Sequence, residues 1–81
     1  MDEKMYHLRK SFPDECETIA FLMAEDPEFG TICEDYNDCV QVCDYWNRSK
    51  APEAVTRINE YRILIKELEN EIVEFLQLLR K

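Results

Sequence analysis

The chain has 81 residues, with 10 Lys+Arg against 18 Asp+Glu and a formal net charge of −8. This length makes one small domain, whose thin core is often helped by oligomerisation. An apolar content of 46% is too high for a disordered chain, and a charged content of 35% is too high for a membrane protein. A single glycine and a single histidine leave little material for phosphate-binding loops, catalytic triads or histidine-based metal sites.

The negative charge is concentrated in the middle of the chain. Residues 11–47 contain ten acidic residues and no Lys or Arg, whereas residues 48–81 are nearly balanced. This pattern favours helices with complementary flanks, and it leaves open an acidic docking face for a basic partner. The acidity argues against binding to nucleic acid or to an anionic membrane. Without an apolar N-terminal run or a long apolar segment, a cytoplasmic protein is expected.

The first predicted helix lies near the N-terminus. Residues 1–10, including His7, are polar and are expected to form a flexible arm, so that a single domain covers residues 11–81. Ser11, Pro13 and Asp14 provide a capping hydroxyl, a first-turn proline and an early acid, which are typical of a helix start. The sequence therefore predicts a helix over residues 12–25.

A break is expected at Asp26 and Pro27, because proline lacks an N–H and disfavours helical geometry in the residue before it. The next helix is predicted over residues 27–47. Its apolar residues are spaced alternately three and four apart, as in a heptad seam. They are Phe29, Ile32, Tyr36, Cys39, Cys43 and Trp46.

A third helix is predicted over residues 52–80, after a short connection and with Pro52 in its first turn. It carries a matching seam, so the two long helices should lie antiparallel. The expected fold is all-α: an antiparallel, coiled-coil-like helical hairpin with a short N-terminal helix that is either kinked or folded back. Numbering symmetrically about the turn places Arg62 near Asp38 and Lys66 near Asp35, which suggests ion pairs across the seam.

This pattern resembles the YdcH-like family of short bacterial helical-hairpin proteins. The resemblance covers about residues 14–79 and is carried by the run from Glu25 to Phe29 and by Lys66, Leu68 and Ile72. It implies a helical hairpin without catalytic residues or an assigned biochemical function. The chain departs from the family pattern by its cysteines in the second helix.

The cysteines provide the main chemical alternative. Zinc sites usually contain Cys-x-x-Cys pairs, and this sequence has none. Cys39 and Cys43 share the seam, where cysteine behaves as a small apolar residue, so buried thiols are favoured over a metal site. A metal- or redox-responsive role for Cys33, Cys39 and Cys43 is the alternative hypothesis. No metal, cofactor or catalytic residue is predicted.

Too many apolar residues surround the last helix for one neighbour to cover. We therefore expect a homodimer packed through the helix over residues 52–80, with Leu64 and Leu78 on one flank of its seam and Leu76 on the other. The expected function is a non-enzymatic interaction module that self-associates and presents an acidic face to a protein partner. The candidate interface residues are Leu64, Ile72, Phe75, Leu76, Leu78 and Leu79.

Overall fold

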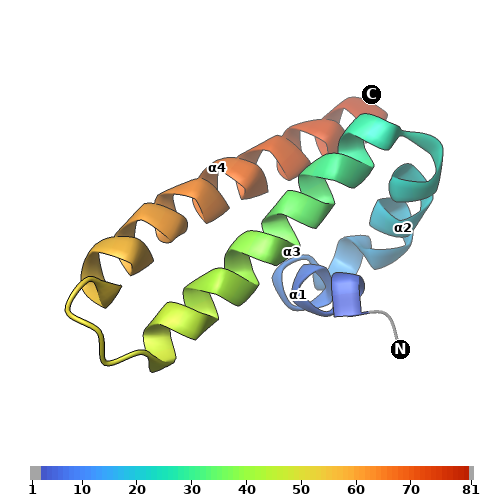
Figure 1. The fold of residues 1–81 in the computed structure, drawn as a ribbon. Helices are drawn as coiled ribbons and strands as arrows, with labels where there is room; N and C mark the ends of the chain where they lie inside the picture. Colours follow the sequence, from blue (N-terminus) through green and yellow to red (C-terminus); the bar gives the residue numbers. More distant parts are fainter. Residues whose placement is uncertain (1–2, 81) are drawn as a thin grey trace.

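The computed structural model describes residues 3–80, and the side chains of residues 6–79. Helices α3 and α4 form an antiparallel hairpin, and α1 and α2 pack beside α3 (Figure 1). No strand occurs within residues 3–80, so the predicted all-α hairpin is confirmed. The elements are α1 (Glu3–Ser11), a short 3-10 turn (Pro13–Glu15), α2 (Cys16–Glu25), α3 (Pro27–Arg48) and α4 (Ala54–Arg80).

The break at Asp26 decides the path of the chain. One carboxylate oxygen of Asp26 accepts hydrogen bonds from the backbone N–H groups of Glu28, at 3.0 Å, and Phe29, at 3.3 Å. Pro27 is the first residue of α3, where its missing N–H costs nothing. Because Asp26 itself is extended, α2 ends there and folds back against α3. Of the two arrangements left open by the sequence, the folded-back one is observed.

The N-terminal segment differs from the expectation. The flexible arm predicted for residues 1–10 is wrong for residues 3–10, which belong to α1, whereas residues 1 and 2 lie outside the described part. The side chain of Leu8 is 0% exposed and belongs to the core, and His7 is half-buried in the same helix. A single apolar residue thus anchors a segment whose average composition is polar.

Ser11 also differs from its predicted role as a helix cap. It is the last residue of α1, and its hydroxyl lies 2.6 Å from the hydroxyl of Tyr36. Tyr36 donates its own proton to a carboxylate oxygen of Glu69 at 3.1 Å, so Ser11 is the donor in the shorter bond. Burial raises the pKa of Tyr36, and the Glu69 charge adds to this effect while the Ser11 bond opposes it. This chain of two hydrogen bonds joins α1, α3 and α4.

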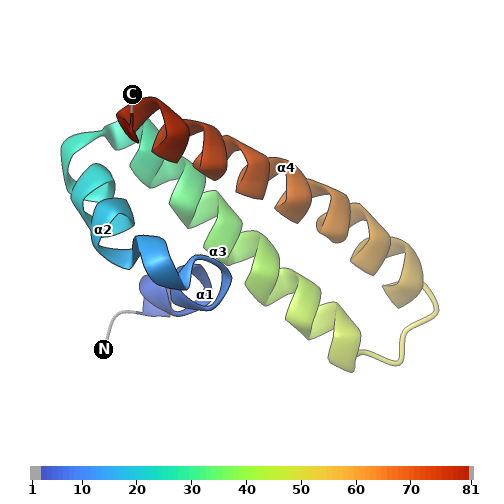
Figure 2. The ribbon, with the colours of Figure 1, turned by 180° about the vertical axis from the view of Figure 1, so that it is seen from behind.

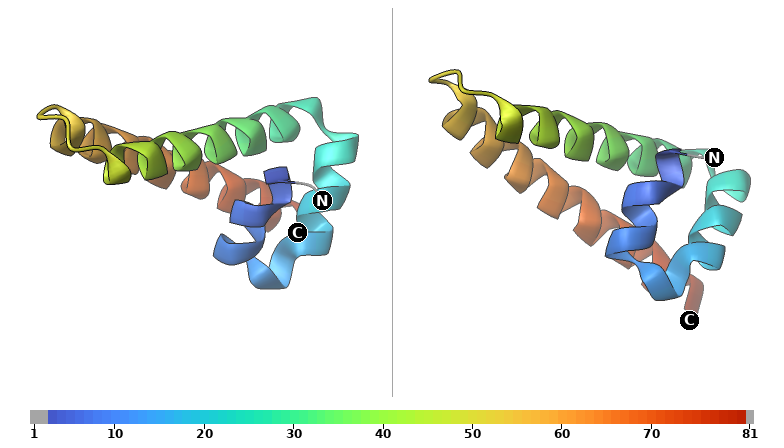
Figure 3. Two further views of the ribbon diagram at one scale, coloured as in Figure 1. Left: turned by 60° about the horizontal axis from the view of Figure 1, so that its bottom comes forward. Right: turned by 90° about the horizontal axis from the view of Figure 1, so that it is seen from below.

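The core lies at the end of the hairpin where α3 begins, on the side that α1 and α2 cover (Figures 2 and 3). The rings of Phe29 and Phe75 meet edge to face across α3 and α4, with centroids 5.2 Å apart. The helix once expected over residues 12–25 is divided here into the 3-10 turn and α2. The buried cluster comprises Leu8, Ile19, Leu22, Phe29, Cys33, Tyr36, Ile72 and Leu76.

Replacing Leu8 by Ala tests whether α1 is docked. We expect the free energy of unfolding to fall by about 2–4 kcal/mol, because a buried leucine is removed and leaves a cavity. Amide hydrogen exchange in residues 3–11 should also accelerate. The matched control is Leu78→Ala, which removes the same atoms from a side chain that is 67% exposed and should change stability little. Equal effects of the two substitutions in chemical denaturation would contradict the docking of α1.

Candidate functional site

The candidate site is a shallow groove between α3 and α4. One hollow of about 250 Å³ is lined by Asp35, Asp38, Cys39, Leu64, Glu67, Leu68 and Glu71. A second, of about 460 Å³, is lined by Glu28, Thr31, Ile32, Glu71, Glu74 and Phe75. Because Glu71 lines both, the two hollows are adjacent. We call them together the acidic groove.

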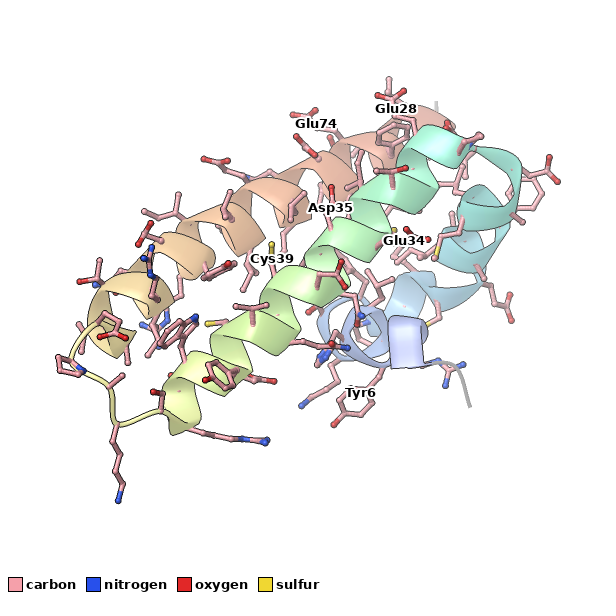
Figure 4. All side chains as sticks on the ribbon, viewed as in Figure 1. Tyr6, Glu28, Glu34, Asp35, Cys39 and Glu74 are labelled. Carbon is pink, nitrogen blue, oxygen red and sulfur yellow. The ribbon has the colours of Figure 1, made fainter. Side chains whose placement is uncertain are left out.

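Seven-residue spacing explains why these residues share one side of the hairpin. Glu28 and Asp35 stand seven apart on α3, and Leu64 and Glu71 stand seven apart on α4. A repeat of seven returns to nearly the same side of a helix. In Figure 4, Asp35 and Cys39 point from α3 toward α4, while Glu28 and Glu74 lie nearer the end of the hairpin where α3 begins. These residues were not predicted as a site from the sequence, although their seven-residue spacing is present in it.

The groove lies on the side of the hairpin away from α1 and α2. Those helices pack on the other flank of α3, behind α3 in the view of Figure 1 and in front of it in Figure 2. Cys33, which is buried among the core residues, faces that covered side, whereas Cys39 lines the groove. The two faces of the hairpin are therefore unequal: one is closed by α1 and α2, and the other is open.

The electrostatics of the groove are one-sided. Six carboxylates line it, and among the described side chains no Lys or Arg does. The predicted ion pairs of Arg62 with Asp38 and Lys66 with Asp35 are wrong, because no bond joins them among residues 6–79. Arg62 and Lys66 each stand two residues from Leu64 on α4. Two residues correspond to about 200° around a helix, so Arg62 and Lys66 lie on a different side of α4 from Leu64 and the groove. Asp35 and Asp38 instead face Glu67 and Glu71.

The predicted interface residues fall into two groups. Ile72 and Leu76 are buried in the core and are unavailable to a second chain, so this part of the prediction is wrong. The reason is that the folded-back N-terminal helices join the core on that side of α4. Phe75 is half-buried and lines the groove. Leu64, Leu78 and Leu79 keep 44%, 67% and 50% of their surface exposed.

The cysteines do not converge. Cys43 is buried, and Cys33 and Cys39 face different sides of α3. Burial raises the pKa of Cys33 to about 12. Burial also raises the pKa of Cys39, with the charges of Asp35 and Asp38 as further causes. Within the described residues, no three His, Cys, Asp or Glu side chains are arranged to hold a metal ion.

Comparisons with known proteins add no family to this description. Family models, curated proteins and solved structures were searched, and none matches the chain. The resemblance to YdcH-like proteins therefore stays a prediction. Among the helices described within residues 3–80, none has the length and apolar character needed to cross a membrane.

The raised pKa of Cys39 provides a test of the charge inside the groove. Replacing Asp35 and Asp38 by Asn should lower this pKa, because the thiolate then forms beside fewer negative charges. At a fixed pH below the pKa, more thiolate is present and alkylation by iodoacetamide should be roughly twofold faster or more. Cys16, on α2 outside the groove, is the internal reference. A Cys39 rate that does not change relative to Cys16 would show that the two acids do not act on the groove.

Proposed function

We propose that this chain is a non-enzymatic protein-interaction module and that the acidic groove binds its protein partner. One observation carries the proposal: six carboxylates and four apolar side chains line the open face of the hairpin, and among the described side chains no Lys or Arg lines it. The side chain of Leu64, which is 44% exposed at one end of the groove, supports this use.

The form of the groove favours a macromolecular partner over a substrate. Enzyme sites usually enclose most of a small ligand and bring together a few polar groups with shifted pKa values. Here both hollows are open to solvent, and their polar groups, which are six carboxylates with Thr31 and Cys39, are spread along two helices. These features support a binding role without catalysis.

The alternative role for Cys33, Cys39 and Cys43 receives less support. A metal- or redox-responsive site needs thiols that lie together and ionise readily. The raised pKa values of Cys33 and Cys39 reduce the thiolate fraction at neutral pH. The three side chains also lack a common site, since Cys33 lies in the core and Cys39 in the groove.

Self-association through α4 is a second proposal. Its surface is smaller than the predicted interface, because Ile72 and Leu76 are buried in the core. It is favoured by the exposed side chains of Leu64, Leu78 and Leu79. Two copies meeting through this face would bring Glu67, Glu71 and Glu74 close to like charges. Such an association should be weak at low ionic strength.

Sedimentation at micromolar concentration tests this second proposal. Raising the salt concentration should shift the chain from monomer toward dimer, because salt screens the repulsion between copies that each carry −8. Leu64→Ser should abolish the shift, whereas Val55→Ser, on α4 outside the groove, should preserve it. A dimer that is equally stable at low salt would contradict this charge argument.

Affinity capture from the source cells tests the proposed function itself. Three baits are compared: the wild type, the groove variant Leu64→Ser/Glu71→Lys, and the control variant Val55→Ser/Glu17→Lys, whose positions lie outside the groove. Quantitative mass spectrometry should find proteins retained by the wild type and the control and lost from the groove variant. Identical sets of proteins on all three baits would contradict a docking role for the groove.

A further inference from the structure

We propose that the occupant of the acidic groove is a basic amphipathic α-helix, lying along α3 and α4 as a third helix of a bundle. The inference rests on the proposed function, and it names the chemistry of the partner. It is carried by two features of the described residues: apolar side chains from both α3 and α4 line the groove, and carboxylates from both helices line it beside them.

The shape of the groove favours a helix over an extended peptide. An extended peptide gains its affinity by pairing with a free backbone edge, as at the side of a sheet. The groove is lined by residues within two α-helices and not by a free strand edge. Their backbone N–H and C=O groups are already hydrogen-bonded within each helix. A third helix satisfies its own backbone and can set its side chains between those of α3 and α4.

The length of the groove sets the length of the occupant. Its lining on α4 extends from Leu64 to Phe75. At a rise of 1.5 Å per residue, this corresponds to about 17 Å, or roughly three helical turns. A partner helix of about 12–15 residues would cover the groove from end to end.

The floor of the groove sets the apolar face of the occupant. We call the apolar side chains of the lining its floor: Leu64 and Leu68 line one hollow, and Ile32 and Phe75 line the other. Leu64 remains 44% exposed in the absence of a partner. Apolar residues spaced alternately three and four apart along the incoming helix would cover these side chains.

The two rims set the charge of the occupant. Glu28, Asp35 and Asp38 form the α3 rim. The α4 rim is formed by Glu67, Glu71 and Glu74. Lys or Arg on both sides of the incoming apolar stripe would therefore meet carboxylates on both sides, and an acidic or neutral helix would leave them facing one another without a cation.

The same charges disfavour a second copy of this chain as the occupant. A symmetric dimer sets a patch against itself, so the rims would meet the same carboxylates of the partner. The chain has basic residues in the last turn of α1, at Arg9 and Lys10, but α1 is held at its own site by the fully buried Leu8. Phosphates of nucleic acid or lipid would be repelled by the rims.

A synthetic peptide provides the test. The probe is a fluorescently labelled peptide of about 15 residues, with leucines alternately three and four apart, lysines on both flanks of that stripe, and alanine elsewhere. Fluorescence anisotropy should report binding to the folded chain, and the binding should weaken as salt is added. Amide shifts in NMR should change at residues 28–39 and 64–75, which line the groove.

Matched variants and peptides separate the groove from general charge attraction. Glu71→Lys, at the junction of the two hollows, should weaken binding about tenfold, whereas Glu17→Lys on α2 should change it less than about twofold. Circular dichroism confirms that both variants fold. A peptide of the same composition with the stripe scrambled should bind much more weakly. Equal losses for Glu71→Lys and Glu17→Lys, or equal binding of the scrambled peptide, would overturn the proposal.

Failure of this proposal is distinguishable from failure of the proposed function. If the basic helix does not bind while affinity capture still depends on Leu64 and Glu71, the groove docks a partner of other chemistry and the helix proposal is overturned. If the peptide fails and the same two substitutions abolish a salt-promoted dimer, the occupant is a second copy. If amide shifts change only in residues 3–25, the peptide binds at α1 and α2 and the groove is not its site.

Discussion

The hydroxyl of Tyr36 is the point at which three helices are joined. Tyr36 is almost fully buried, and its hydroxyl lies between Ser11 of α1 and Glu69 of α4. A buried hydroxyl without a partner would be costly, and both Ser11 and Glu69 relieve this cost for Tyr36. This places α1 on one flank of the hairpin, where Leu8 completes the core. The opposite flank is left open as the acidic groove.

The covered and the open face of the hairpin thus differ in composition. On the covered face, aliphatic and aromatic side chains from all four helices form the core that stabilises a small chain. On the open face, apolar residues occur between carboxylates that no described cation neutralises. Acidic residues there add little to stability, since exposed charges interact weakly and like charges repel. We propose that their arrangement serves to attract a basic partner.

Local signals in the sequence were sufficient for the hairpin and for the break at Asp26. Asp26, Pro27 and the seam spacing each act through near neighbours or a regular repeat. The α1 helix was missed because one residue, Leu8, docks a segment that is otherwise polar. The groove was missed for a geometric reason. Numbering symmetrically about the turn predicts which residues of the two helices lie at the same height along the hairpin. It does not predict on which side of the seam each residue lies. Lys66 and Asp35 lie at the same height but on different sides of the seam. Exposure also depends on tertiary packing, which the seam spacing does not reveal. The prediction of Ile72 and Leu76 as interface residues fails for this reason, because α1 and α2 complete a core around them.

The central claim is that one face of the hairpin is covered by α1 and α2 while the other is open. Methyl NMR with a neutral, soluble gadolinium chelate tests it most directly, because relaxation by the chelate increases with solvent exposure. The methyl groups of Leu64 and Leu78 should relax strongly, and those of Leu8, Ile19 and Ile72 should be protected at every protein concentration. Protection of Leu64 and Leu78 in the dilute monomer, or strong relaxation of Leu8, would contradict this account.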